Sequence, residues 1–579
     1  MKKSREVLYK AEKVNDFKEL INRSAKLYGN KPAFKYKITP KDTNFINITY
    51  SEFKHDIDKL GTALFDLGLH KKRIIVIGPN RYEWCVSYLA ITTGNMVVVP
   101  LDKALPEGEI IESVIRSEAN AVIFDTKYLD TFKKIRNKKN SKLKTYICMD
   151  LDEDTDGILS YKKLLDKGKK LIENGDFSHI NCKVDNKKMS IMLFTSGTTS
   201  VAKIVMLSHY NICSNIYSLS CMAKVTKKDT FLSFLPLHHT YESTTTFLYG
   251  LYCGLTIAFC DGLRHIVSNL KEYKVTGFVT VPILLETMYK KIMQGIENKG
   301  KLEIFNKMIK LSKFLLKFKI DIRKLLFKSV INELGGHLRV IVYGASSTDK
   351  NTIEFFNNIG INMLNGYGLT ETSPVLSAEN DKYKKTGSVA FPMPGMQIKI
   401  DNPDKNGIGE ILAKGPCVML GYYKNEEATK EALTDGWFHT GDLGYYDEDG
   451  YLFISGRKKN VIVLKNGKNV FPEEIELLIS KLPYVSENMV YARPKDNGDI
   501  IVGAKIVYNK DIMKEMFPSA KAKEYYDIIW KNIKNINQTM PQYKYIKHLI
   551  ITDEPMIKTT TQKIKRYEEI VKILNNDEN

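Results

Sequence analysis

Short apolar runs rich in β-branched residues alternate with helix-like segments through the first half of the chain. A continuous apolar run of this kind is typical of a strand that is buried on both faces. Strands that alternate with helices form βαβ units, because two parallel strands need a long crossover connection. The runs that show the pattern are residues 73–78, 96–100, 121–124, 277–281 and 338–343. We therefore expect an α/β fold around a buried, mostly parallel sheet.

The chain has 579 residues, which is too many for one ordinary hydrophobic core. After Lys385, Gly, Pro and Asp become frequent and strand-like runs follow one another closely, so we expect a small antiparallel or barrel-like unit there. From about Lys459 the pattern is that of a smaller α+β domain, with residues 500–507 as one of its strands. The predicted organisation is a large N-terminal domain of βαβ units plus the barrel-like unit, residues 1–458, and a C-terminal domain, residues 459–579.

The charge balance is strongly basic. The chain carries 87 Lys and Arg against 67 Asp and Glu, a net charge of +20. Such an excess fits two kinds of partner, nucleic acid or an anionic membrane surface. The sequence contains no RNA-recognition or helix-turn-helix pattern, so we expect no nucleic-acid partner. No pattern in the sequence specifies an oligomeric state.

Cysteine usage and the N-terminus indicate a cytoplasmic protein. The eight cysteines show no CxxC pair and no short paired spacing, which argues against a disulfide framework and a cysteine-based zinc site. The first residues are basic, but no apolar run follows them, so we expect no signal peptide. Residues 243–260 are uncharged over a bilayer-spanning length, yet their Thr and Gly content favours a buried helix that runs into a strand. We expect a protein that is at most peripheral on the inner face of a membrane.

Much of the excess charge is concentrated in residues 299–328, which hold ten basic residues against two acidic ones. Apolar residues recur between these charges at helical spacing, namely Ile304, Met308, Leu311 and Leu315. The segment could be a basic amphipathic helix for an anionic membrane surface. It could also be a surface helix whose apolar stripe faces the core while its lysines are solvated, which is the commoner arrangement and the one that we favour. A second basic run, residues 133–144, has no apolar stripe and is expected to be a solvated loop.

Three further patterns do not hold. His238 and His239 have the chemistry of metal ligands, but no His or carboxylate cluster at metal spacing accompanies them in the sequence. Residues 152–163 begin like a calcium loop but end in Lys163, where a bidentate Glu is required. Gly366 and Gly368 begin a dinucleotide fingerprint that lacks its third Gly.

The most informative segment is residues 195–203, which follows a strand-like run, residues 190–194. Its members are Thr195, Ser196, Gly197, Thr198, Thr199, Ser200, Val201, Ala202 and Lys203. Small hydroxyl residues around a Gly present hydroxyls and backbone N–H groups toward one point, which suits phosphate oxygens, and the Lys adds positive charge. The loop is not a Walker A loop, since no Gly-Lys-Ser/Thr ends it. An ordinary Ser/Thr-rich turn is the alternative.

This loop and six further segments resemble, in the same order, the adenylate-forming superfamily of acyl-CoA synthetases, adenylation domains and luciferases. The further segments are residues 235–242, 343–346, 365–372, 437–444, 450–459 and 558–566, so the resemblance covers nearly the whole chain. Residues 333–339 and 235–242 are similar to the long-chain acyl-CoA synthetase branch. The resemblance implies that the C-terminal domain is mobile, with a hinge near Lys459.

The activity that the resemblance implies is ATP-dependent conversion of a long-chain fatty acid to acyl-AMP and pyrophosphate, followed by transfer to CoA. A carboxylate is a weak nucleophile, so the first step depends on neutralising the charge of the phosphates. Fatty acid, ATP and CoA are the implied ligands, and Mg²⁺ is the implied ion. Two alternatives stay open, an acyl-AMP or acyl carrier protein ligase of the same family and a catalytically slow nucleotide- or lipid-binding relative.

The resemblance also implies roles for single residues. The hydroxyl loop from Thr195 to Lys203 would hold the β- and γ-phosphates, and Thr198 and Glu371 would hold Mg²⁺. Tyr367 would stack on adenine, and Asp442 and Arg457 would bind the ribose hydroxyls. The other nucleotide-binding residues would be Gly344, Ala345, Ser346, Asn365, Gly366, Gly368 and Thr370.

The implied catalytic residues are Lys563, His239 and Glu371. Lys563 would bridge the fatty carboxylate and the α-phosphate and stabilise the charge that grows in the transition state, and His239 would lie near the carboxylate. Pivoting about Lys459 would then remove Lys563 and bring Gly467 and its loop to the thiolation site.

Four positions depart from the family pattern. Ser200, Ala202 and Ile204 stand where Gly, Pro and Gly are usual, and Gln562 stands where Gly is usual. Side chains restrict backbone conformations that Gly allows, and β-branched Ile204 would do so most. Since the charged residues are retained, we expect an active enzyme with altered loop kinetics.

Overall fold

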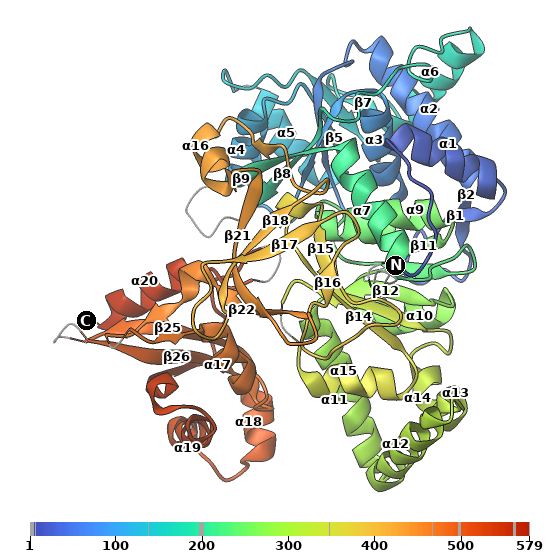
Figure 1. The fold of residues 1–579 in the computed structure, drawn as a ribbon. Helices are drawn as coiled ribbons and strands as arrows, with labels where there is room; N and C mark the ends of the chain where they lie inside the picture. The colour runs from blue at the N-terminus through green and yellow to red at the C-terminus, as the bar shows by residue number, and fades with distance from the viewer. Residues whose placement is uncertain are drawn as a thin grey trace.

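The computed structural model describes residues 5, 7–136, 138–195, 202–346, 348–465, 467–495, 499–559 and 563–577. These residues form two large mixed sheets, a smaller antiparallel unit and a C-terminal α+β domain (Figure 1). The α/β fold expected from the sequence, with a large N-terminal domain and a smaller C-terminal domain, is confirmed.

The first large sheet has nine strands among the described residues, in the order β16-β15-β14-β13-β12-β10-β11-β1-β2. The strands from β14 to β1 pair in parallel, whereas β15, β16 and β2 pair antiparallel at the two edges. The bounds are β1 Pro32–Tyr36, β2 Ile46–Thr49, β10 Thr230–Ser233, β11 Thr256–Phe259, β12 Gly277–Thr280, β13 Val340–Gly344, β14 Asn362–Gly368, β15 Val375–Ala378 and β16 Phe391–Pro392.

The second large sheet has eight described strands, in the order β19-β9-β8-β4-β3-β5-β6-β7. It is parallel from β8 to β7, and β8 and β9 form an antiparallel pair that continues into β19. The bounds are β3 Arg73–Ile77, β4 Val97–Leu101, β5 Ala121–Phe124, β6 Thr145–Cys148, β7 Leu159–Ser160, β8 Met189–Thr195, β9 Lys203–Ser208 and β19 Gly421–Tyr422. The five apolar runs identified in the sequence therefore lie in strands of the two sheets, as predicted.

Helices cover both faces of each sheet. One apolar core joins the facing sides of the two sheets through α1 Phe17–Tyr28, α2 Tyr50–Asp66, α3 Tyr82–Thr93, α7 His209–Met222 and α9 Tyr249–Cys253. The outer face of the nine-stranded sheet is covered by α10 Ile266–Glu272, α11 Pro282–Asn298, α12 Leu302–Lys317, α14 Lys328–Glu333 and α15 Lys350–Asn358. The outer face of the eight-stranded sheet is covered by α4 Glu107–Ser117 and α5 Leu129–Arg136. The other helices of this part are α6 Tyr161–Glu173, α8 Thr240–Glu242, a π-helical turn Ser243–Leu248, α13 Arg323–Leu326 and α16 Glu426–Ala432.

The antiparallel unit and the C-terminal domain follow in the chain (Figure 1, yellow to red). The antiparallel unit consists of β17 Gln397–Asp401, β18 Gly409–Lys414, β20 Leu433–Thr434, β21 Trp437–Tyr446 and β22 Leu452–Arg457. The strands of the C-terminal domain are β23 Ile462–Val463, β24 Asn469–Val470, β25 Val485–Pro494, β26 Ile500–Tyr508 and β27 Ile546–Thr552. Its helices are α17 Pro472–Ile479, α18 Lys510–Met516, α19 Tyr525–Gln538 and α20 Arg566–Asp577, and it has an apolar core of its own.

Two local predictions need correction. The basic segment 299–328 is not one helix, because α12 ends at Lys317, Lys319 takes a positive φ of 62°, and α13 and α14 follow. The second basic run is not wholly a loop, because Lys133 and Lys134 belong to the last turns of α5. Phe132 and Ile135 of that helix are buried against the sheet, so tertiary packing decides the conformation of a segment whose lysines suggested a loop.

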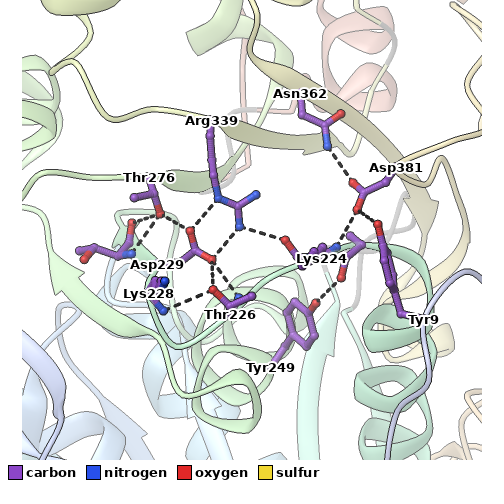
Figure 2. A network of polar contacts seen from close by, with 12 residues as sticks. Tyr9, Lys224, Thr226, Lys228, Asp229, Tyr249, Thr276, Arg339, Asn362 and Asp381 are labelled. Carbon is purple, nitrogen blue, oxygen red and sulfur yellow. Dashed lines mark hydrogen bonds and ion pairs between the residues drawn. The ribbon is translucent and has the colours of Figure 1, made fainter. Parts of the chain in front are cut away.

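A buried ion pair fastens the amino ends of the parallel strands in the nine-stranded sheet (Figure 2). Arg339, which precedes β13, donates from Nε and Nη2 to the two carboxylate oxygens of Asp229, which precedes β10, at 2.7 and 2.6 Å. Thr276, which precedes β12, donates its hydroxyl to the same carboxylate at 2.8 Å. Asn362 in β14 is tied in the same way to Asp381, at 2.8 Å. This network lies at the edge of the sheet opposite to the carboxyl ends of its strands and leaves that other edge for a site.

Candidate functional site

The candidate residues gather at the carboxyl ends of parallel strands, where α/β sheets bind ligands. Thr195 ends β8, His239 follows β10, and Gly344 and Gly368 end β13 and β14. Ser196, Gly197, Thr198 and Thr199, with the departure Ser200, lie outside the described residues, as does Gln562.

The two ends of the hydroxyl loop are held by the β8–β9 pair. Thr195 lies opposite Lys203, and its hydroxyl donates to the carbonyl of Lys203 at 3.3 Å. The Lys203 ammonium lies over the ring of Tyr422, 4.6 Å from its centroid. Ile204 is buried within β9 opposite Phe194, where a β-branched side chain suits the strand, so this departure from Gly does not strain the backbone there. The carbonyl of the neighbouring Ala202 accepts a hydrogen bond from Arg116.

The next part of the site is the end of β13 and the adjacent β14. Gly344 pairs with Gly366, and a Cβ at Gly344 would lie 2.4 Å from the Gly366 carbonyl oxygen, so only Gly allows this approach. Ala345 takes φ 73°, a strained conformation for a residue with a side chain, and Ala345 and Ser346 are exposed. Asn365 is fixed at both ends, because its N–H donates to Glu379 at 3.0 Å and its side-chain amide donates to the Ser388 carbonyl at 2.8 Å.

Tyr367, Asp442 and Arg457 form one hydrogen-bonded unit. The Tyr367 hydroxyl donates to Oδ2 of Asp442 at 2.7 Å, and Nε of Arg457 lies 2.7 Å from Oδ1. Asp442 and Arg457 face each other across the β21–β22 pair, so the strand register creates this contact. Burial raises the pKa of the Asp442 carboxyl, and Arg457, Tyr367 and the more distant Lys563 oppose that rise.

Glu371 lies in the short turn Thr370–Thr372 that follows β14. Its carboxylate accepts a hydrogen bond from the Tyr422 hydroxyl at 2.9 Å. Because Lys203 lies over the same tyrosine ring, Tyr422 joins the phosphate-loop strand to the Glu371 turn. Carboxylate and hydroxyl oxygens are ligands that Mg²⁺ prefers, and Glu371 is the described member of the pair predicted for that ion.

Lys563 reaches this site from the C-terminal domain. It is held in a narrow hairpin, in which the Thr559 N–H donates to the Lys563 carbonyl at 2.8 Å and the Lys563 N–H donates to the Thr559 hydroxyl at 3.1 Å. Its positive charge contributes to the pKa shifts of both His239, which precedes α8, and Asp442, which lies in β21. The surrounding protein and the charge of Arg457 lower the pKa of Lys563 although its side chain is open to solvent, while Asp442 opposes the shift.

His239 belongs to a cluster that the sequence did not reveal. The ligand-type atoms of Asp102, His238 and His239 lie within 4.8 Å of one another, with His238 Nε2 3.4 Å from the Asp102 carboxylate. The expectation that no carboxylate accompanies the two histidines was therefore wrong, because Asp102 follows β4 and is distant in sequence. Burial, followed by the charge of His238, lowers the pKa of His239 to about 3, so its imidazole is neutral at physiological pH.

The hinge residues lie on the C-terminal side of the site. Lys459 is in the short turn Lys458–Asn460 that follows β22. Gly467 is an exposed residue with φ 74° in the turn between β23 and β24.

Sequence analysis missed three residues that shape the site, Asp102, Tyr422 and Glu379. None stands in one of the seven segments, and each reaches the site through strand pairing or packing between distant parts of the chain. The charge arrangement as a whole is nevertheless clear. Lys203 and Glu371 both contact Tyr422, and Arg457 pairs with Asp442, so cations and carboxylates alternate along the site.

The chain is similar to known proteins along most of its length. The AMP-binding enzyme family matches residues 21–423, and the AMP-binding enzyme C-terminal domain matches residues 459–572. Long-chain-fatty-acid–CoA ligase 6 of Mus musculus is 30% identical over 93% of this chain and 79% of its own length. Long-chain-fatty-acid–[acyl-carrier-protein] ligase AEE15 of Arabidopsis thaliana, a chloroplastic protein, is 27% identical over 95% of this chain and 84% of its own length.

Solved structures show the same fold. The anthranilate CoA ligase AuaEII in complex with anthranoyl-AMP superimposes with a TM-score of 0.75 at 18% identity and covers 96% of both chains. A fatty acyl CoA synthetase of Mycobacterium tuberculosis superimposes with a TM-score of 0.65 at 20% identity, over 96% of this chain and 97% of its own.

Proposed function

The chain belongs to the AMP-binding, adenylate-forming enzyme family, and on that premise we propose that it is a long-chain fatty acid–CoA ligase that works through acyl-AMP. In the first step the fatty carboxylate attacks the α-phosphate of ATP and pyrophosphate leaves. In the second step the CoA thiol attacks the acyl carbon and AMP leaves. The observation that carries the proposal is the hydrogen-bonded unit of Tyr367, Asp442 and Arg457, which joins the end of β14 to the antiparallel unit.

The charges of the site support the first step. Lys203 and the N–H and hydroxyl groups of the loop that begins at Thr195 would hold the β- and γ-phosphates, and Lys563 would neutralise the charge that develops between the carboxylate and the α-phosphate. His239 is neutral and lies beside these charges, so it could donate one hydrogen bond to the carboxylate without adding charge.

The nucleoside would be bound by the Tyr367–Asp442–Arg457 unit. Asp442 accepts from both partners and keeps lone pairs for a ribose hydroxyl, since a carboxylate offers about four acceptor positions. Glu371 and Thr198 are the residues that we propose for Mg²⁺, which would neutralise phosphate charge when bound. The open end of β13 at Ala345 and Ser346 would face the adenine.

The second step would require the C-terminal domain to turn about Lys459, so that Lys563 leaves and the Gly467 turn approaches the thiol. An acyl carrier protein is the alternative acceptor, because the Arabidopsis relative is named for that reaction. A catalytically slow nucleotide- or lipid-binding protein is the second alternative, and the retained charged residues count against it.

We place the enzyme in the cytoplasm, with access to the inner face of the membrane. None of the helices in the described part of the chain has both the length and the apolar character needed to cross a membrane. The basic surface that supports contact with anionic lipid is described in the next subsection.

The direct test measures pyrophosphate and AMP release from Mg-ATP with a panel of fatty acids, with and without CoA. Acid-dependent pyrophosphate release followed by CoA-dependent AMP release is expected, strongest for long acids. Pyrophosphate release without a response to CoA would indicate a carrier-protein acceptor, which holo-acyl carrier protein would then restore. ATP binding with no acid-dependent pyrophosphate release across the panel would contradict the proposal.

A further inference from the structure

Helix α12 has two apolar stripes, only one of which packs against the protein. Phe305, Met308 and Ser312 turn toward α11 and α15, and Phe305 contacts Phe327 and Phe355. The second stripe turns outward and consists of Ile304, Leu311, Phe314 and Phe318. Its members are 47% to 62% exposed. The prediction that the stripe of Ile304, Met308, Leu311 and Leu315 faces the core is therefore wrong for Ile304 and Leu311, which are exposed, while the buried residues of α12 are Phe305 and Ser312.

The outward stripe continues beyond the end of α12. Ile320 and Leu325 are also exposed, so six of the exposed large apolar side chains of the described chain fall between residues 304 and 325. Phe314 and Phe318 contact each other with their ring centroids 5.2 Å apart, so two of the exposed apolar side chains form one continuous apolar element. Apolar groups gathered in this way mark a contact surface, whereas single exposed apolar residues need no explanation.

The same surface is rich in unpaired positive charge. Of the ten basic residues in 299–328, three form ion pairs, Lys299 with Glu333, Lys307 with Glu303 and Arg323 with Asp321. The other seven make no ion pair with any described residue, and they are Lys301, Lys310, Lys313, Lys317, Lys319, Lys324 and Lys328. Lys310 and Lys317 belong to the same helix as the outward stripe. Unpaired lysines interleaved with exposed phenylalanines are the pattern of a helix that lies at a lipid interface.

The position of α12 makes this surface accessible. α12 lies in the outermost layer over the nine-stranded sheet, beyond α11 and α15, and projects at the lower end of the molecule (Figure 1). The ligand site lies at the carboxyl ends of the strands, and no residue assigned to it belongs to α12. Contact through α12 would therefore leave that site free.

We infer that the α12 surface, residues 301–328, docks the enzyme on an anionic lipid bilayer. In an anionic bilayer, negative headgroups that attract lysines lie directly above an apolar layer that can accept phenylalanines. An acidic protein surface would attract the lysines but would offer no such apolar layer. The docking itself does not depend on the proposed function, but its use to the enzyme does. Long-chain acids partition into bilayers, so a fatty acid ligase docked on a bilayer would find its substrate there.

The test is co-sedimentation of the full-length protein with phosphatidylcholine vesicles and with vesicles that also contain phosphatidylglycerol. Two variants probe the surface, the charge variant Lys310→Glu/Lys313→Glu/Lys317→Glu and the apolar variant Leu311→Ser/Phe314→Ser/Phe318→Ser. Binding of the unmodified protein to the anionic vesicles is expected, with at least about a tenfold loss of affinity in each variant. Because the Debye length shrinks as salt is added, salt should weaken binding of the apolar variant and of the unmodified protein alike.

Matched controls come from other exposed positions. The charge control is Lys138→Glu/Lys139→Glu/Lys144→Glu in the second basic run, and the apolar control is Ile38→Ser/Phe177→Ser. Both controls should bind as the unmodified protein does, and all variants should keep its Tm and its pyrophosphate release with a dispersed acid.

Two results would contradict the inference. One is that the unmodified protein fails to bind anionic vesicles, and the other is that the α12 variants bind them as well as the controls do. If the α12 variants instead abolish self-association in the absence of lipid, the surface is a protein interface and the inference is again wrong. If the unmodified protein and the controls bind anionic vesicles and the α12 variants do not, but no acid-dependent turnover is measured, the docking inference is supported and the proposed function is contradicted.

Discussion

At the scale of single residues, Lys563 is the group proposed to stabilise the transition state of the first step. If it has this role, Lys563→Ala should lower acid-dependent pyrophosphate release by roughly 10²–10³-fold, as removal of a group that stabilises a transition state does. Conversion of added acyl-AMP to thioester should change little, because that step does not need the lysine. Lys565→Ala is the matched control, since Lys565 belongs to the same hairpin but pairs with Glu568. Equal losses in both steps would assign Lys563 a structural role.

Tyr367 combines two functions that substitution can separate. Its hydroxyl donates to Asp442, whereas its ring is the group proposed for adenine. Tyr367→Phe should raise the KM for ATP by about tenfold or less, as loss of one hydrogen bond to a charged group does. Tyr367→Ala removes the ring as well and should raise the KM further, and neither change should alter the KM for CoA. An equal effect of the two substitutions would mean that the ring does not contact the nucleotide.

At the scale of elements, the Asp229–Arg339 pair holds the amino ends of β10 and β13. The Asp229 side chain is 4% exposed, so Asp229→Asn would leave Arg339 partly buried without its counter-charge and cost about 3 kcal/mol. The Tm should fall by roughly 3 °C while the KM for ATP is retained, because the pair is at the edge opposite to the site. Asp152→Asn is the control, since its ion pair with Lys162 is exposed and should contribute almost nothing. A large effect of the control, or none at Asp229, would contradict this account.

The sequence predicts elements better than it predicts contacts between them. The strands β3, β4, β5, β12 and β13 are continuous apolar runs, and a local pattern is enough to identify them. Asp102 and Tyr422 were missed because they reach the site by strand order, which local patterns do not specify. For α12, helical spacing grouped Ile304 and Leu311, which are exposed, with Met308, which packs against the core, because spacing alone does not specify which side of the helix meets α11 and α15. The site segments were identified by their resemblance to a family, and the described contacts explain Gly344 and Asp442 physically.

At the scale of the whole molecule, buried ionisable groups set the pH range of stability. Burial lowers the pKa of His179 to about 4 and that of His209 to about 3, with Lys18 adding to both shifts. The unfolded chain binds protons on these histidines below about pH 6.5 while the folded chain does not, so stability is full above that pH and falls as the pH is lowered. Each histidine should cost about 2 kcal/mol at about pH 5. Measured as Tm against pH, the acid decline should be shallower in His209→Gln than in the exposed control His55→Gln. Parallel curves for the two variants would show that His209 is not responsible.

The buried Glu242 should make the folded state less stable as the pH rises, which is opposite to the effect of the two histidines. Burial raises its pKa to about 8, and its carboxyl oxygens accept hydrogen bonds from Ser233 and Thr246 at 2.6 and 3.0 Å. The folded chain therefore holds a proton that the unfolded chain releases above about pH 4.5, so this contribution is full at low pH and is lost as the pH rises through about 8. Glu242→Gln, which stays neutral, should flatten the decline of Tm on the alkaline side and leave the acid side unchanged. A decline that stays as steep in this variant would assign it to other groups.

The largest motion proposed for the molecule concerns the connection between its domains. In the proposed mechanism Lys563 acts in the first step, and thioester formation would require the C-terminal domain to turn about Lys459. Proline fixes φ near the value found in a 3₁₀ turn, so Lys459→Pro should keep the observed arrangement and restrict others. Acid-dependent pyrophosphate release should then be retained, while CoA-dependent AMP release slows by about tenfold or more because the turn is hindered. Lys459→Ala removes the same side chain without restricting φ, and it should leave both rates within about a factor of two or three if the backbone rather than the ammonium group matters. Equal slowing in the two variants would assign the effect to the lysine side chain, and unchanged AMP release in Lys459→Pro would place the pivot elsewhere in the chain.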